Sequence, residues 1–125
     1  MAIEFSASDE QVDETTQVVS VRGEIDLFTA PEFKALIHDA IEAGRDLVVV
    51  DLTATSFIDS SSLGVLIAAH RRLKLRGGRV VVACDVPAVL STFKITGLDS
   101  VLEMAASRDD ALAARAAAGA ARDAA

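Results

Sequence analysis

"VVVDLTATSFIDSSSLGVLIAA", residues 48–69, is the stretch that decides the fold of this chain. Its start belongs to "DLVVVDL", residues 46–52, a valine-rich run typical of a strand covered on both faces in a parallel sheet. Its end opens a stripe at helical spacing that comprises Leu63, Leu66, Ile67, His70 and Leu73. The stretch therefore predicts a buried strand followed closely by a helix that packs on the sheet.

The N-terminal half predicts two strands and a helix. Short apolar or alternating patterns at residues 2–7 and 17–23 indicate a strand pair, and the acidic segment between them indicates a turn. The segment "TAPEFKALIHDAIEAG", residues 29–44, has an apolar stripe on one face of a helix. Thr29 is expected to be its N-cap, with Glu32 completing a capping box.

The C-terminal half continues the alternation of strands and helices. The segments after residue 70 predict the end of the second helix at 71–76, a strand at 79–84, a helix at 85–97 capped by Asp85, a strand at 100–106 and a helix capped by Ser107. The expected order is β-β-α-β-α-β-α-β-α, which indicates a single α/β domain with a central, mostly parallel mixed sheet. We expect the domain to span residues 1–118, with an Ala-rich tail at 119–125.

Composition excludes several classes of function. The net charge of −7 disfavours binding to nucleic acid or to an anionic membrane surface, and the absence of Trp and Tyr disfavours base stacking. No signal peptide is recognisable, and no apolar run approaches the roughly 20 residues that span a bilayer. Cys84 has no partner cysteine in the chain, which fits a reducing compartment. We therefore expect a cytoplasmic protein.

The sequence offers little for catalysis or metal binding. The only histidines, His38 and His70, both fall within helical patterns, and no G-x-S-x-G elbow or phosphate-binding glycine loop is present. Two histidines and one cysteine without ligand spacing make a zinc site improbable. We expect a protein that is not an enzyme and that has no metal and no cofactor of its own.

Three consecutive serines, Ser60, Ser61 and Ser62, follow Asp59 where the central strand gives way to its helix. Asp and Ser are good N-cap residues, so capping by one side chain with the others in solvent would account for them. Capping needs only one side chain, however, and a phosphate would suit the positive end of the helix dipole. Local chemistry leaves both interpretations open.

The chain resembles a known family in three segments. "VRGEIDLFTAPEF" (residues 21–33), the stretch at 48–69 and "VVACDVPAVLSTFKITGLDSVLEM" (residues 81–104) are similar to bacterial STAS domains of the anti-sigma-factor antagonist group. The resemblance covers roughly residues 3–115 and preserves the order of elements. Its most specific parts are the G-E-[IL]-D segment and the D-S-[ST]-x-L-G turn.

The resemblance implies a partner switch in transcription regulation, of the kind used in stress responses. The unmodified antagonist would bind an anti-sigma factor that is also a serine kinase of the histidine-kinase-like ATPase fold, and the sigma factor would be freed. The kinase would use ATP and Mg²⁺ to phosphorylate the antagonist, which then dissociates, and a PP2C-type phosphatase would reset it. A scaffold STAS domain that does not switch, or a subunit of a larger assembly that senses a nucleotide or another small ligand, is the alternative.

The resemblance also assigns the site residues. Ser60, directly after Asp59, matches the phosphorylated serine, and Ser61 is a less favoured acceptor. Asp26 matches an acidic residue near the modified serine, although an Asx turn at the start of the first helix would equally explain it. Many members have glycine where this chain has Ser62, and Gly64 matches a glycine that lets the start of the helix pack closely. The expected partner-binding set is Asp26, Asp59, Ser60, Ser61, Ser62, Leu63 and Gly64.

Overall fold

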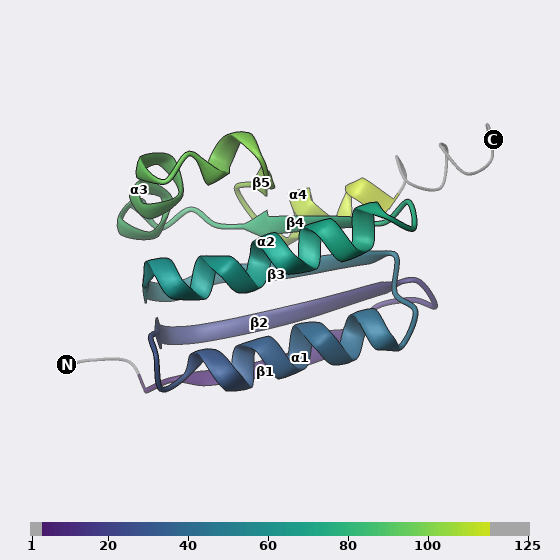
Figure 1. Cartoon of the computed structure of the whole chain (residues 1–125), viewed down its shortest axis with the longest axis horizontal. Coiled ribbons are helices and arrows are strands. Elements are labelled where there is room, and N and C mark those ends of the chain that lie inside the picture. The colour runs from purple at the N-terminus through teal and green to yellow at the C-terminus, as the bar shows by residue number, and fades with distance from the viewer. Residues whose placement is uncertain (1–3, 116–125) are drawn as a thin grey trace.

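The computed structural model describes residues 4–115, in which strands and helices alternate along the chain (Figure 1). The elements are β1 (Ser6–Gln11), β2 (Thr16–Ile25), α1 (Ala30–Glu42), β3 (Leu47–Ile58), α2 (Ser60–Lys74), β4 (Arg79–Ala83), α3 (Pro87–Ile95), the 3-10 helix η1 (Leu98–Ser100), β5 (Glu103–Ala105) and α4 (Arg108–Leu112). The predicted order is confirmed, with η1 as an addition. The predicted boundary between domain and tail, at residues 118 and 119, lies outside the described residues.

The strands form one mixed sheet in the order β1-β2-β3-β4-β5. β1 is antiparallel to β2, and every other neighbouring pair is parallel. Helices α1, α2 and α3 each connect one parallel strand to the next. Because β2, β3 and β4 run in the same direction, the loops that leave them share one edge of the sheet, where α/β proteins usually bind their ligands.

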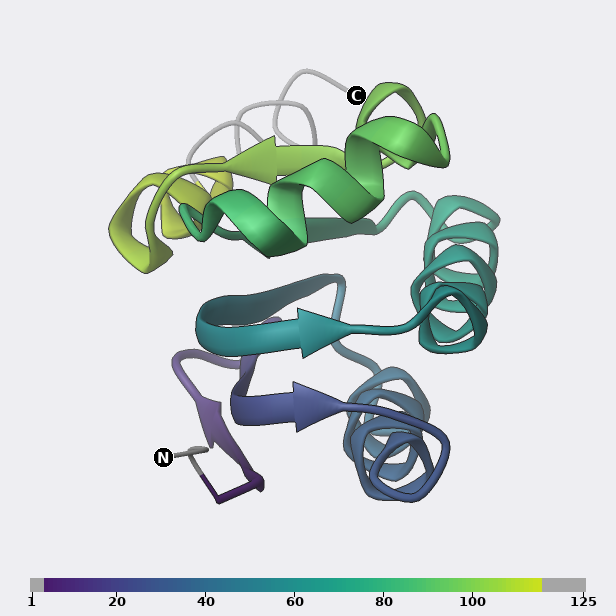
Figure 2. The same ribbon diagram turned by 90° about the vertical axis from the view of Figure 1, so that its left-hand side faces the viewer.

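Helices cover both faces of this sheet, as the valine-rich strand predicts. Val48 and Val50 of β3 belong to the larger core cluster, together with buried side chains of α1, α2 and α3. Val49, between them, belongs to the second cluster, on the opposite face, with Ala111 of α4. Figure 2 shows α1 and α2 on one side of the strands and α4 on the other. Burial on both faces explains why apolar residues run without interruption here.

β1 differs from its prediction in position. It covers Ser6–Gln11, so the prediction that residues 8–11 of the acidic segment belong to a turn is wrong, and residues 2 and 3 of the predicted strand lie outside the described residues. An edge strand needs few buried side chains, and those of β1 are mostly exposed while its backbone pairs with β2 along its whole length. The turn is shorter and is closed by Asp13, whose carboxylate accepts the backbone N–H of Thr15 at 2.9 Å.

β3 is longer than predicted and carries the chain to the site. It runs from Leu47 to Ile58, whereas the apolar run predicts a strand only over 46–52. Ile58 still pairs with Ile25 of β2, although β4 pairs with β3 only along residues 47–51. The extension therefore rests on pairing with β2, which the polar segment after residue 52 does not reveal.

Of the predicted caps and boundaries of α3, β5 and α4, some are confirmed and others are wrong. α3 begins at Pro87 after Val86 and has no side-chain cap, so the prediction that Asp85 caps it is wrong. β5 is shorter than predicted because η1 occupies residues 98–100. Ser107 caps α4 as predicted, since its hydroxyl accepts the N–H of Asp110 at 3.1 Å.

Other details follow the sequence more closely. Gly97 has a φ of 76° after the last turn of α3, the left-handed conformation that glycine adopts without strain. Cys84 is buried, as predicted, and that burial raises the pKa of its thiol. Within residues 4–115, no helix combines the length and the apolar character needed to cross a membrane.

Candidate functional site

The site lies at the edge of the sheet where β2 and β3 end. Ile25 and Ile58 are paired in the sheet, and each is followed by an aspartate, Asp26 and Asp59. The backbone N–H of Asp59 donates to the carbonyl of Ile25 at 3.1 Å, which ties the two turns together. Residues that are 33 positions apart in the chain therefore form one surface, as expected for strands with a common direction.

Asp59 is the N-cap of α2. Its Oδ1 accepts the backbone N–H of Ser62 at 2.9 Å and the hydroxyls of Ser62 at 2.6 Å and Ser61 at 3.0 Å. Asp59 itself has extended backbone angles, φ −84° and ψ 163°, as N-cap residues usually do. One carboxylate oxygen therefore fixes the start of the helix and holds two of the three serine hydroxyls.

The three serines differ sharply in exposure. Ser62 is fully buried at 0% exposure, whereas Ser60 and Ser61 are exposed. Among the hydrogen bonds of residues 4–115, none involves the hydroxyl of Ser60. Ser60 thus presents an unoccupied hydroxyl to solvent at the first residue of a fifteen-residue helix.

Asp26 organises the neighbouring turn. Its Oδ1 accepts the backbone N–H groups of Phe28 at 2.9 Å and Thr29 at 3.1 Å. The Thr29 hydroxyl accepts the N–H of Asp26 at 2.9 Å and lies 3.0 Å from the carbonyl of Glu24, so it does not cap α1. Thr29 occupies the N-cap position as predicted, but the predicted capping box with Glu32 is wrong because the Thr29 side chain makes no cap hydrogen bond. Asp26 makes the Asx turn that the sequence left open.

Comparison with known proteins agrees with this architecture. The family model described as "STAS domain" matches residues 7–111. The chain belongs to the STAS domain family. The anti-sigma-B factor antagonist of Listeria monocytogenes is 33% identical over 87 residues, which are 69% of this chain and 75% of that protein.

Solved structures agree with the family assignment. An anti-sigma factor antagonist from Mycobacterium paratuberculosis matches this STAS domain with a TM-score of 0.80 and 32% identity, over 89% of this chain and 93% of that one. The anti-sigma factor antagonist SpoIIAA in its unphosphorylated form matches with a TM-score of 0.75 and 26% identity, over 86% and 93% of the two chains. The resemblance that the sequence shows is thus confirmed for family and fold.

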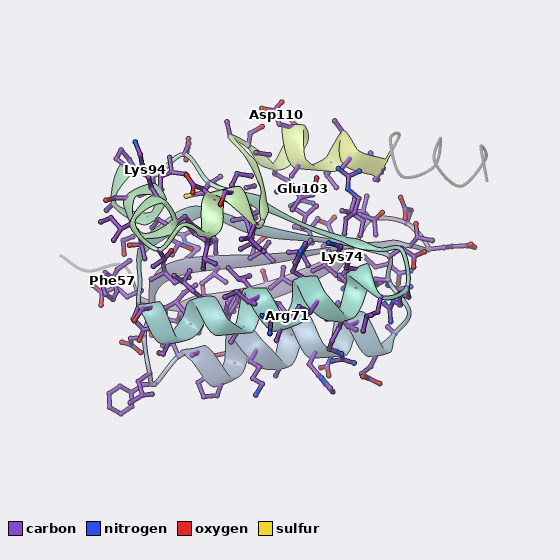
Figure 3. All side chains as sticks on the ribbon, turned by 45° about the horizontal axis from the view of Figure 1, so that its top comes forward. Phe57, Arg71, Lys74, Lys94, Glu103 and Asp110 are labelled. Carbon is purple, nitrogen blue, oxygen red and sulfur yellow. The ribbon has the colours of Figure 1, made fainter. Side chains whose placement is uncertain are left out.

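Exposed apolar side chains lie at the same edge of the STAS domain as the serines, in the turn after β2 and near the end of β3, and the sequence did not predict them. Leu27 and Phe28 are 71% and 90% exposed in the turn built by Asp26, and Phe57 is 48% exposed one residue before Ile58. Figure 3 shows Phe57 at the edge of the sheet where α2 begins. A usable signal was the pair "LF", because these residues precede the predicted helix and have no place in its apolar stripe.

Two members of the expected partner-binding set are buried, and the packing role expected of a third, Gly64, is not observed. Ser62 and Leu63 are buried, at 0% and 2% exposure, so they can only support the surface from beneath. Gly64 is exposed, and a Cβ added there would meet no atom within 4 Å. The expectation that Gly64 allows close packing of the helix within the domain is therefore wrong.

The carboxylate of Asp59 has an altered acidity with a clear cause. The hydroxyl of Ser62, together with the N–H of Ser62 and the hydroxyl of Ser61, lowers the pKa of Asp59 against the opposing effect of burial. These bonds favour the ionised form, because a charged acceptor binds donors more strongly than a neutral one. Among residues 4–115, no group of three His, Cys, Asp or Glu side chains is placed to hold a metal ion.

We expect Asp59→Ala to lower the free energy of unfolding by about 1 kcal/mol at neutral pH, the usual cost of removing an N-cap. A carboxylate with a lowered folded-state pKa stabilises the fold above its unfolded-state pKa, and this contribution disappears as the pH falls through the folded-state value. The difference between the variant and the natural protein should therefore shrink below about pH 4. Urea unfolding at several pH values measures it. Asp59→Asn is the control, because it keeps an acceptor but cannot titrate; an unchanged deficit in the Ala variant at low pH would contradict the assignment.

Proposed function

We propose that this STAS domain is an anti-sigma-factor antagonist that is switched by phosphate at Ser60. In its unmodified form it binds an anti-sigma factor that is also a serine kinase, and a sigma factor is freed. The observation that carries the proposal is the exposed, unbonded hydroxyl of Ser60 at the start of α2, beside exposed apolar side chains. The names of the similar proteins support it, and one of them, SpoIIAA, is described as being in its unphosphorylated form.

The domain is a substrate in this scheme and not an enzyme. Oγ of Ser60 bonds to the γ-phosphorus of ATP while the bond from that phosphorus to the β–γ bridging oxygen breaks. ADP leaves, and the hydroxyl proton passes to a base of the kinase, which also holds the Mg²⁺. A PP2C-type phosphatase reverses the modification with water, which releases inorganic phosphate and restores the hydroxyl.

The location of Ser60 lets the fold tolerate a phosphate that a bound partner does not. A phosphoserine carries a charge of about −1.5 to −2 at pH 7 and would lie at the positive end of the α2 dipole, so the helix should remain folded. The same charge directly follows Asp59 in the chain, at the edge of the sheet that also displays Phe28 and Phe57. A partner that covers these apolar side chains would have to bury the phosphate beside them, and burial of an unpaired charge is costly.

The test is to incubate the domain with its cognate anti-sigma kinase, ATP and Mg²⁺ and to locate the phosphate by mass spectrometry. We expect one phosphate per chain on the natural protein and none on Ser60→Ala. Ser91→Ala, a change of an exposed serine in α3, is the matched control and should be phosphorylated like the natural protein. A domain that binds the kinase but receives no phosphate at residues 60–62 would instead support the scaffold or small-ligand alternative.

A further inference from the structure

The serine hydroxyls at the start of α2 are not equivalent acceptors. Ser62 is fully buried, and both its hydroxyl and that of Ser61 donate to the same oxygen of Asp59, at 2.6 and 3.0 Å. Ser60 is exposed and its hydroxyl is free of such a bond among the described residues. A kinase that approaches this turn therefore finds a single hydroxyl that needs neither desolvation of a core residue nor the breaking of a charge-assisted hydrogen bond.

Asp59 does not make Ser61 the better nucleophile, although a carboxylate can serve as a general base for a hydroxyl that donates to it. Its Oδ1 accepts three donors, and these lower the pKa of the carboxyl, which weakens it as a base. The transferred phosphoryl group of ATP is itself anionic. Attack by Ser61 in this position would bring that group next to the carboxylate, which like charges disfavour.

Gly64 adds an independent observation on the same helix. Glycine in a helix interior costs roughly 0.5–1 kcal/mol relative to alanine. Gly64 is exposed, is not among the glycines with positive φ, and has open space where a Cβ would be. Nothing inside the described domain therefore requires glycine there, so the advantage of a missing side chain must lie outside the fold.

The position of Gly64 indicates what that advantage is. A residue four positions after Ser60 lies on the same face of α2, about 5–6 Å away between Cβ atoms. Helical side chains lean toward the N-terminus and cover the preceding turn. A side chain at position 64 would therefore lie over Ser60, and glycine leaves the approach to that hydroxyl clear.

We infer that the chain itself selects Ser60 as the phosphate acceptor: Asp59 withholds the hydroxyls of Ser61 and Ser62, and Gly64 keeps the approach to Ser60 open. The inference rests on the proposed function and adds to it that the choice of residue is built into the substrate. Asp59 and Gly64 act here as positioning residues, because neither receives the phosphate.

The first test weakens the hold on Ser61. Asp59→Asn keeps a side chain that caps helices well but replaces the charged acceptor with a neutral one, which weakens the hydrogen bond that the Ser61 hydroxyl donates. With the cognate kinase, ATP and Mg²⁺, we expect the share of phosphate on Ser61 to rise about tenfold, which corresponds to a charge-assisted hydrogen bond weakened by about 1.4 kcal/mol. Fragmentation mass spectrometry measures the ratio of the two sites, which a loss of stability alone would not change.

The second test separates stability from access at position 64. Gly64→Ala should raise the free energy of unfolding by about 0.5–1 kcal/mol, because alanine favours the helix and meets no clash. Gly64→Leu should slow phosphorylation of Ser60 at least about tenfold, because small misplacements of reacting groups cost up to 10²-fold in rate. Ala43→Leu, at the exposed C-cap of α1, is the matched control and should leave the rate unchanged.

The outcomes distinguish this inference from the proposed function. Three results together support the inference: phosphate on Ser60 alone in the natural protein, a larger share of phosphate on Ser61 in Asp59→Asn, and slower phosphorylation of Gly64→Leu. Phosphate that stays entirely on Ser60 in all variants at the natural rate overturns the inference and leaves the switch intact. Phosphate mainly on Ser61 in the natural protein also overturns it. No phosphate on any of the three serines overturns the proposed function and the inference together.

Discussion

Replacing Ser60 with glutamate should weaken binding to the ADP-bound kinase, which cannot transfer phosphate, by about tenfold to a hundredfold. Ser60→Ala should leave the affinity nearly unchanged. The glutamate places one permanent charge where a phosphate would place nearly two, directly after Asp59 in the chain and at an edge of the sheet with exposed apolar side chains. Like charges and unpaired charges inside an interface cost several kcal/mol, and each 1.4 kcal/mol corresponds to a factor of ten. Isothermal titration calorimetry of both variants measures the difference directly.

The fold should not suffer from this substitution. An acidic side chain in the first turn of a helix is favourable by about 0.3–1 kcal/mol, so Ser60→Glu should unfold at the same urea concentration as the natural protein or slightly higher. Ser91→Glu adds the same charge at an exposed position of α3, outside the residues that build the site, and should bind normally. Equal affinities of Ser60→Ala and Ser60→Glu would remove the basis for a charge-operated switch, and equal losses in Ser60→Glu and Ser91→Glu would point to net charge instead of position.

The sequence predicts the architecture because the decisive patterns are local and redundant. A run of valines, Val48 to Val50, supplies apolar side chains to both faces of the sheet. The apolar stripe that begins at Leu63 has helical spacing and therefore predicts a helix. The predicted boundaries are wrong where pairing between distant segments of the chain determines how far a strand extends. The polar end of β3 is a strand only because β2 lies beside it as far as Ile58, and no residue of that segment indicates this by itself.

The site was predictable in its location but not in its details. Sequence alone places Ser60, Ser61 and Ser62 together after a strand, yet their hydroxyls differ only through the direction that the backbone gives each one around Asp59. The 100° step between helical residues turns Ser62 into the core and leaves Ser60 outside. The role of Asp26 also depends on geometry that the sequence does not show. Its Oδ1 accepts the N–H groups of its own turn.

That turn changes which residue should contact the partner. Asp26 fixes the backbone through Phe28 and Thr29, and the result is a short, constrained loop that holds Leu27 and Phe28 out in solvent. A turn whose backbone is already fixed before binding loses little backbone conformational entropy when its side chains are buried by a partner. We therefore expect Phe28, at 90% exposure, to be an anchor that enters an apolar pocket of the proposed kinase partner, with Asp26 fixing the turn that presents it.

We expect Phe28→Ser to weaken binding of the unmodified domain to the kinase by about thirtyfold, which corresponds to the roughly 2 kcal/mol typical of an aromatic anchor. The fold should be unaffected, because a side chain this exposed contributes little to the core. Phosphorylation at Ser60 should slow in parallel at low kinase concentration and recover when the kinase is in excess, since the loss lies in association and not in the reacting hydroxyl.

Leu75 provides the matched control for this substitution. It is 91% exposed, almost the same as Phe28, but it is the C-cap residue of α2, at the far end of the helix from Ser60. Leu75→Ser should therefore bind and be phosphorylated like the natural protein. If both substitutions weakened binding to the same extent, general surface hydrophobicity would explain the effect. If neither did, the partner would have to bind the start of α2 without the β2–α1 turn, even though the bond from Asp59 to Ile25 joins the two.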